Sequence, residues 1–175
     1  MLKNTLNLPE LVFIATKDGR DAFLSASPYP VLIPQAVTIG DLLEDDDDGG
    51  TMHHIPGAED DITIFETPRV LVLRKRSDLR ESQSIGLGRT PDTDLVVSDH
   101  SVSKQHAIFH RVGGTHWELE DTNSKNGTWI DDLRLIPGVP VRIESKEELR
   151  FGRVHLRFFA PEDFFEMVVA AFATP

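Results

Sequence analysis

The chain of 175 residues contains no cysteine. This absence excludes disulfide bonds, thiolate nucleophiles and cysteine-ligated zinc, and it fits a reducing compartment. Long apolar runs are also missing, since no stretch approaches the ~20 residues that a membrane-spanning helix needs. The start, from Met1 to Asn4, lacks the apolar stretch and small-residue cleavage site of a secretion signal. We therefore expect a cytoplasmic protein with no membrane partner.

Basic residues are scarce, and their distribution is uneven. The chain holds 18 Lys and Arg against 29 Asp and Glu, a net charge of −11. Residues 1–68 carry 3 basic and 13 acidic residues, whereas residues 69–160 carry 15 and 13 and residues 161–175 carry 0 and 3. The acidity therefore belongs to the flanks of a mildly basic middle segment. A protein that binds duplex DNA normally has a basic stripe and a high isoelectric point, so no nucleic-acid partner is expected.

The first 43 residues predict a small extension. Apolar clusters predict a short helix near 9–17, a second near 20–26 and then a short strand at Val31-Leu32-Ile33. Because such a segment is too small to fold alone, we expect it to dock on the main domain. Residues 44–68 contain Asp45-Asp46-Asp47-Asp48 followed by two glycines, and such self-repelling charge predicts a flexible, acidic linker.

The pattern changes from residue 69 to period-two alternation. Short runs place apolar residues on one face and are separated by turn signals such as Gly113-Gly114. Val70-Leu71-Val72-Leu73 opens a strand. The alternating residues are Trp117 and Leu119, Val139, Val141 and Ile143, Leu149 and Phe151, and Val154, Leu156 and Phe158. This pattern predicts an all-β sandwich over residues 69–160.

The tail returns to a helical period. Pro161-Glu162-Asp163 places a proline and two acids in a first helical turn, where the backbone donors and the helix dipole favour them. The apolar stripe that follows consists of Phe164, Phe165, Val168, Val169 and Phe172. We expect a helix over 161–175 that packs back on the sandwich.

Groups suited to a phosphate stand in order within the middle segment. Gly88 permits a sharp turn after a predicted strand over 84–87, and Arg89 then presents its planar donor fork from a loop. Ser103 and Lys104 precede a predicted strand over 105–112, where a hydroxyl and an ammonium could each donate to a phosphate oxygen. Asn126 and Gly127 lie in a polar turn. Because Asn-Gly pairs favour the geometry of tight turns, Asn126 taken by itself would have a purely structural role.

Taken together, these motifs resemble the forkhead-associated (FHA) domain family. The matching residues are Gly88-Arg89, Asp94-Leu95-Val96-Val97, Ser103-Lys104-Gln105-His106-Ala107, Trp117-Glu118-Leu119-Glu120-Asp121, Ser124-Lys125-Asn126-Gly127-Thr128 and Leu149-Arg150-Phe151-Gly152. The resemblance covers roughly residues 69–160. It implies a β-sandwich of about eleven strands that binds phosphothreonine in an extended peptide.

The resemblance also implies roles for single residues. Arg89 and Ser103 would contact the phosphate, with Lys104 as a further donor. Asn126 would hold the peptide main chain beside the phosphothreonine. Ser101 stands where some family members place an auxiliary hydroxyl.

Three residues are expected to be structural, namely Gly88, His106 and Gly127, with the histidine bracing the loops beneath the phosphate. Two positions depart from the family pattern. Lys125 stands where some members carry a threonine, so it is either a third cation or simply solvated. Asp131 stands where a second asparagine usually follows, which leaves the preference for flanking peptide residues open.

An enzymatic interpretation would use Ser103, His106 and an acid such as Asp121. Residues three apart on a strand point to opposite faces, and no nucleophile elbow, Walker loop or zinc motif accompanies them. The adjacent histidines at 53 and 54 in the linker are poor metal ligands without further partners. We therefore expect a protein that is not an enzyme and has no cofactor or metal.

The sequence favours a phosphothreonine-peptide-binding module that acts as an adaptor or regulator in Ser/Thr kinase signalling. Its partner would be a kinase or a kinase substrate. The alternative is an FHA-fold interaction domain that does not depend on phosphorylation. A further question stays open, because Thr51, Thr63 or Thr67 in the acidic segment could be an internal phosphosite or part of an inert spacer.

Overall fold

The structure, a computed structural model, describes residues 8–35, 70–75, 84–114 and 116–172. Helices α1 (Leu8–Lys17) and α2 (Arg20–Ala26) and strand β1 (Val31–Pro34) lie where the apolar clusters predicted them. The acidic segment 44–68 and its three threonines lie outside the described residues, so the domain boundaries drawn from the sequence stay a prediction. No helix in the described ranges is long and apolar enough to cross a membrane.

Eleven strands confirm the predicted all-β class. After β1 they are β2 (Leu71–Val72), β3 (Ser84–Gly88), β4 (Leu95–Val96), β5 (Ala107–Val112), β6 (His116–Asp121), β7 (Thr128–Ile130), β8 (Leu133–Arg134), β9 (Val141–Ile143), β10 (Glu148–Phe151) and β11 (Val154–Phe159). Helix α4 (Pro161–Phe172) ends the described chain. The sequence pattern missed β4, β7 and β8, and it wrongly extended β9 back to Val139, which lies before the strand.

The strands form two sheets. One has the order β2-β1-β11-β10-β7-β8 and the other has the order β4-β3-β5-β6-β9. Strand pairs are antiparallel throughout except for β3 and β4, in which Leu87 pairs with Leu95 in parallel register. The N-terminal strand β1 is an interior strand of its sheet, since Val31 pairs with both Phe159 on β11 and Val72 on β2.

The core lies between the sheets and follows directly from the alternation. Phe109 and Leu119 on one sheet face Leu149, Phe151 and Leu156 on the other, and all five are fully buried. At roughly 1.5–3 kcal/mol for each large apolar side chain removed from water, this layer is the main source of stability. It holds the strand ends, and therefore the loops between them, in fixed positions.

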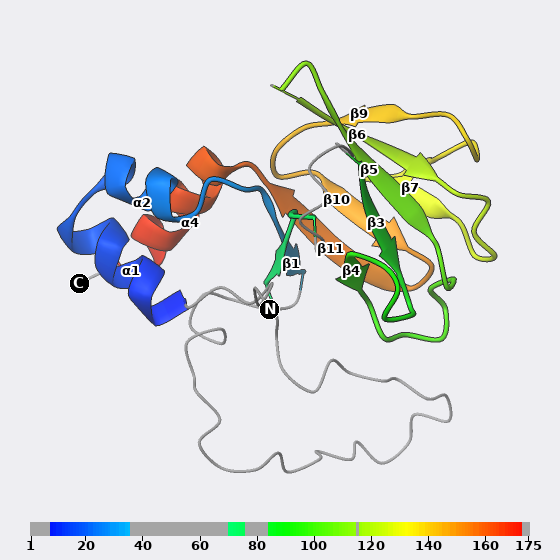
Figure 1. Cartoon of the computed structure of the whole chain (residues 1–175), viewed down its shortest axis with the longest axis horizontal. Helices are drawn as coiled ribbons and strands as arrows, with labels where there is room; N and C mark the ends of the chain where they lie inside the picture. The colour runs from blue at the N-terminus through cyan, green and yellow to red at the C-terminus, as the bar shows by residue number, and fades with distance from the viewer. Residues whose placement is uncertain (1–7, 36–69, 76–83, 115, 173–175) are drawn as a thin grey trace, which may run out of the picture.

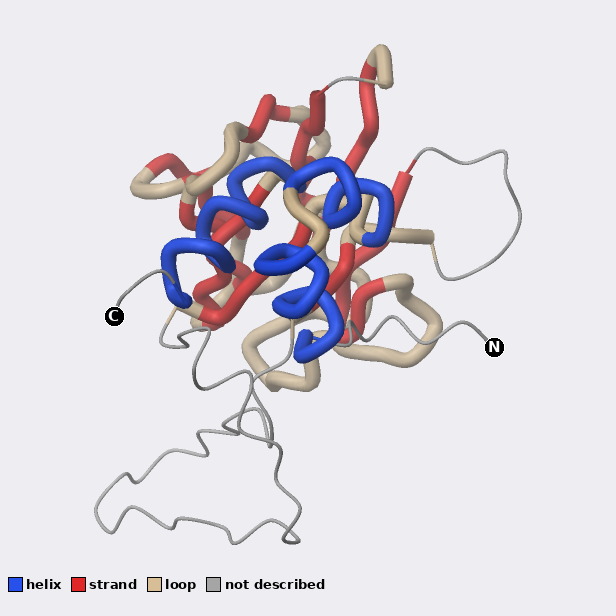
Figure 2. Tube along the Cα trace, turned by 90° about the vertical axis from the view of Figure 1, so that its left-hand side faces the viewer, coloured by secondary structure: helices blue, strands red, loops and turns tan. Residues whose placement is uncertain are grey.

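A second apolar cluster covers the outer face of the first sheet around β1. Val31 and Ile33 face outward toward the helices, whereas Leu32 between them faces the sandwich core. Phe23 of α2 and Phe164 of α4 are fully buried in this outer cluster, with their ring centroids 5.7 Å apart. Figures 1 and 2 show the three helices gathered on this one side of the molecule.

Candidate functional site

The phosphate-suited residues lie on loops that meet at one end of the sandwich. Arg89 follows β3, and its backbone N–H donates to the Ser103 carbonyl at 2.9 Å. Its Nε also donates to the Val102 carbonyl at 3.2 Å. Within the described part of the chain, the two terminal guanidinium nitrogens of Arg89 have no hydrogen-bond partner. The arginine is therefore anchored by its backbone and Nε and still has free donors.

Gly88 allows the β3 end to approach the loop before β5. A Cβ atom built on Gly88 would lie 2.0 Å from the Lys104 carbonyl oxygen and 2.9 Å from Cγ2 of Thr93. Because real atoms do not approach so closely, any larger residue would push the Arg89 loop away from the Ser103-Lys104 loop.

A third loop, between β6 and β7, joins the same cluster. The backbone N–H of Lys125 donates to Ser103 Oγ at 3.0 Å, and Asn126 Nδ2 donates to the Ser101 carbonyl at 2.7 Å. The Ser103 oxygen thus serves as an acceptor, and no acceptor among the described residues takes its hydroxyl proton. The ammonium groups of Lys104 and Lys125 are exposed and form no ion pair with any carboxylate of the described ranges.

His106 is fully buried beneath these loops. Its Nδ1 accepts from the Ser103 backbone N–H at 2.9 Å, so its Nε2 carries the proton that is donated to the Gly127 carbonyl at 3.0 Å. Its ring also packs edge-on against Phe151, with the centroids 5.8 Å apart. Burial lowers the pKa of His106 below its ordinary value, which favours this neutral form.

Asp121, at the end of β6, organises the loop that carries Lys125 and Asn126. Its carboxylate accepts from the Ser124 backbone N–H at 2.9 Å, from Ser124 Oγ at 2.6 Å and from Thr128 Oγ1 at 2.5 Å. Burial alone would raise the pKa of Asp121, but the hydrogen bonds from Ser124 and Thr128 outweigh it and lower the pKa. The aspartate is therefore a charged structural anchor.

Arg153, in the turn between β10 and β11, is a site neighbour that sequence reasoning missed. Its backbone N–H donates to Ser101 Oγ at 3.0 Å, and its Nε lies 3.1 Å from a carboxylate oxygen of the buried Asp99. Asp99 in turn accepts from the Ser101 backbone N–H at 2.7 Å. No local signal reveals these contacts, because they join segments that are far apart in the sequence. They fix Ser101 in place, with its oxygen already accepting one bond.

Asp131, the departure from the family pattern, lies at the far end of β7. Its backbone is left-handed with φ of 48°, and its carboxylate accepts from the Glu148 backbone N–H at 2.9 Å. Strand β7 separates it from the Asn126 loop. Asp131 therefore secures the start of β10 and does not contribute to the loop cluster.

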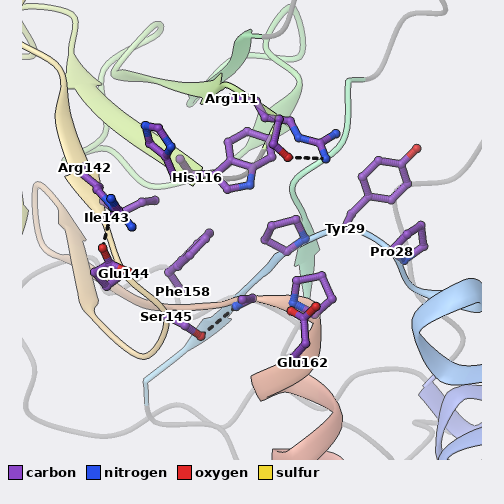
Figure 3. A pocket seen from close by; sticks show the side chains of 15 residues that line it. Pro28, Tyr29, Arg111, His116, Arg142, Ile143, Glu144, Ser145, Phe158 and Glu162 are labelled. Carbon is purple, nitrogen blue, oxygen red and sulfur yellow. Dashed lines mark hydrogen bonds and ion pairs between the residues drawn. The ribbon is translucent and has the colours of Figure 1, made fainter. Parts of the chain in front are cut away.

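One pocket lies elsewhere, beside the opposite ends of β5 and β6. It encloses about 300 Å³ between the sandwich and the chain around Tyr29. Figure 3 shows Arg111, His116 and Arg142 on the sandwich side and Tyr29 and Glu162 across from them. Its charges are mixed, and Arg142 is already paired with Glu144 at 2.7 Å. An extended peptide on loops needs no such cavity.

Comparison with known proteins agrees with the loop cluster and the fold. The family model of the FHA domain matches residues 85–152, which span every site loop described above. The chain carries an FHA domain.

Curated relatives of this FHA domain include regulators by name. An oxoglutarate dehydrogenase inhibitor from Corynebacterium jeikeium is 31% identical over 80 residues, which cover 46% of this chain and 53% of that protein. The FHA domain-containing protein FhaB of Mycobacterium tuberculosis is 37% identical over 75 residues, covering 43% and 48%. The chain thus spans about half the length of these relatives. A second oxoglutarate dehydrogenase inhibitor, from Corynebacterium efficiens, is 25% identical over 141 residues, covering 78% and 94%.

Proposed function

We propose that this chain is a non-enzymatic module that binds phosphothreonine peptides and acts as an adaptor or regulator in Ser/Thr kinase signalling in the cytoplasm. The observation that carries the proposal is the convergence of Arg89, Ser103, Lys104, Lys125 and Asn126 on three cross-linked loops of an FHA domain. The partner would be a phosphothreonine-containing kinase or kinase substrate. Two relatives support a regulatory role by their names, since one is called an enzyme inhibitor and the other an FHA domain-containing protein.

The free donors of the loop cluster match a phosphate. A phosphorylated threonine carries about −1.5 to −2 charges and three strong acceptor oxygens. The terminal nitrogens of Arg89 and the Ser103 hydroxyl would take two of these oxygens, and Lys104 and Lys125 would supply further positive charge. Hydrogen bonds of this charge-assisted kind are roughly twice as strong as neutral ones. Ser101 would be an auxiliary hydroxyl at the edge of the group.

Asn126 would hold the peptide backbone. Its side-chain nitrogen is occupied by the Ser101 carbonyl, which fixes the orientation of the amide. The amide oxygen is then presented as an acceptor for a main-chain N–H of the peptide. A peptide bound in this way would be held through its main chain by Asn126 and through its phosphate by Arg89 and Ser103.

The same geometry argues against hydrolytic chemistry by Ser103, His106 and Asp121. Both ring nitrogens of His106 are engaged with backbone groups, and its contact to Ser103 is through the amide and not the hydroxyl. The Asp121 carboxylate is engaged with Ser124 and Thr128. A base that activates Ser103 Oγ is therefore missing from this trio.

The test is a fluorescence anisotropy titration of the full chain with matched threonine, phosphothreonine and phosphoserine peptides. We expect a preference for phosphothreonine and a loss of affinity of about a hundredfold in Arg89→Ala, since charged hydrogen bonds contribute roughly 1.5–3 kcal/mol each. Arg111→Ala, an exposed arginine at the opposite end of β5, is the matched control and should bind normally. Equal affinity for modified and unmodified peptides would favour the phosphorylation-independent alternative.

A further inference from the structure

Two arginines lie against one tryptophan on the outer face of the first sheet. In the strand register Trp129 on β7 pairs with Arg134 on β8 and with Arg150 on β10. The Arg150 Cζ atom lies 3.5 Å from the indole centroid, and the Arg134 Cζ atom lies 5.2 Å from it. The sequence neighbours of Trp129, Thr128 and Ile130, are buried, so the tryptophan points outward. The helices lie at the β1 side of this sheet, away from β7 (Figure 1).

These two guanidinium groups place like charges against one indole ring, and no acid among the described residues is paired with either of them. Some cations elsewhere in the described structure are paired with an acid, as in Lys75 with Asp94 and Lys146 with Asp163. Neither Arg134 nor Arg150 forms an ion pair with a carboxylate of the described residues. Stacking on the indole face favours each cation, but their mutual repulsion opposes the arrangement. An anion that contacts both guanidinium groups would relieve that repulsion.

The pair also lies beside the loop cluster. Arg134 Nε and Nη2 lie 2.9 and 3.1 Å from the position that a Cβ on Gly127 would occupy, so this guanidinium rests against the residue after Asn126. Arg150 Nη1 points to the carbonyl of Gly152 at 3.4 Å, next to the Arg153 turn. Both cations therefore flank the loops that would hold a phosphopeptide.

We propose that Arg134 and Arg150, held by Trp129, form a second anion subsite for an acidic group on the phosphorylated partner. The shared chemistry is an oxyanion that accepts from two planar guanidinium forks, either an Asp or Glu carboxylate or a second phosphate. The inference rests on the proposed function, because it places the second anion on the same peptide as the phosphothreonine. Successive residues of an extended peptide are about 3.3 Å apart, so a group a few residues from the phosphothreonine can reach the pair.

The test uses phosphothreonine peptides of one length that differ in a single feature. One has neutral flanks, one set has a glutamate scanned through the flanking positions, and a matching set has a phosphoserine there. Affinities for wild type, for R134Q/R150Q and for Arg142→Gln are measured by anisotropy. The last variant removes an exposed arginine from the other sheet and controls for the loss of one positive charge, the change that Arg134→Gln alone makes.

Wild type should bind the best acidic-flank peptide about tenfold more tightly than the neutral-flank peptide, as expected for a charge-assisted contact. This preference should fall below about twofold in R134Q/R150Q and persist in Arg142→Gln, with neutral-flank binding nearly unchanged in both. Comparison of the glutamate and phosphoserine sets shows which oxyanion is preferred. A preference that persists in R134Q/R150Q, or that is absent from wild type, overturns the proposal.

Two further measurements keep the outcome unambiguous. If R134Q/R150Q unfolds, the exposed Arg134→Gln alone should still halve the preference or more, and an unchanged preference in it counts against the subsite. Trp129 supplies a separate signal, since in Trp117→Phe it is the remaining tryptophan, and its emission should respond to acidic-flank peptides more than to neutral ones. Failure of wild type to bind even the neutral-flank phosphopeptide would instead sink the proposed function.

Discussion

The protonated Nε2 of the buried His106 donates to the carbonyl of Gly127, 3.0 Å away, while its Nδ1 accepts from the loop on the other side. One neutral imidazole thus joins the loop before β5 to the loop before β7. A protonated imidazole would turn its Nδ1 into a donor facing the Ser103 N–H, with the loss of that bond. The charge state of His106 is therefore coupled to the loop cluster.

The first prediction concerns pH. Because burial lowers the pKa of His106, the unfolded chain takes up a proton below about pH 6.5 at this residue before the folded protein does. The contribution of His106 to the free energy of unfolding is therefore fully present above about pH 6.5, and it decreases as the pH falls below that value. NMR of the imidazole nitrogens should show that His106 is protonated at Nε2 and that its pKa lies below the ordinary value of a histidine. Titration of His106 at its ordinary value would contradict the assignment.

The second prediction concerns the carboxylate of Asp121. Asp121→Asn replaces an acceptor of three hydrogen bonds by a group that must point an N–H₂ at one of the same donors. We expect a loss of about 2–3 kcal/mol in the free energy of unfolding, since a buried polar group is left unsatisfied. Asp132→Asn, an exposed aspartate in the next turn, should change stability by less than about 0.5 kcal/mol.

Urea unfolding of both aspartate variants would measure this difference. Since the pKa of Asp121 is lowered in the fold, the wild-type advantage is present above about pH 4 and disappears as the pH falls below that value. If the difference in the free energy of unfolding between wild type and Asp121→Asn stays constant from pH 6 to pH 3, the negative charge of Asp121 does not stabilise the fold.

The third prediction uses two glycines of strand β3. Gly88→Ala would place a methyl group 2.0 Å from a backbone carbonyl that cannot move freely, and we expect a loss of about 3 kcal/mol or more. Gly86→Ala is the matched control, because the nearest atom to its added methyl group would be Asp94 Oδ2 at 3.9 Å. Thermal unfolding and phosphopeptide binding should both separate the two variants. Equal behaviour would mean that the close approach of the loops is dispensable.

The sequence predicted the parts of this fold that rest on local patterns. The helical stripe of α4 and the alternation of β6, β10 and β11 reflect burial of one face, which the sequence records directly. Strands β4, β7 and β8 were missed because each has only two or three residues and no run of alternating apolar residues marks it in the sequence. The exposed Phe172, at 43%, shows the limit of the same rule, since the α4 stripe continues beyond the cluster that covers it.

The loop site was predicted in part. Arg89, Ser103 and Asn126 were singled out from a family resemblance, and the structure places them on loops joined by direct hydrogen bonds. The Arg153 contact with Asp99 and the stacking of two arginines on Trp129 were not anticipated. The first joins a loop of one sheet to a turn of the other, and the second needs the pairing of β7 with β10. No local window of the sequence contains either contact.

The fourth prediction concerns the N-terminal segment, which the sequence suggested was a docked extension. Its strand β1 lies between β2 and β11, and Leu32 is fully buried in the core between the sheets. Leu32→Ala should therefore destabilise the whole sandwich by about 3 kcal/mol, as for a large-to-small change in any core. Phe13→Ala in α1, where the ring is 59% exposed, is the control and should be nearly neutral.

Denaturant unfolding followed by tryptophan emission reports on the sandwich itself, because Trp117 on β6 packs against the core and Trp129 lies on β7. A segment that only docks on a complete domain would give a separate, early transition for Leu32→Ala and leave the main transition unchanged. A strand that is part of the sheet gives one cooperative transition at lower denaturant. The pairing of Val31 with both neighbouring strands predicts the second result, and with it a lower midpoint for loss of phosphopeptide binding.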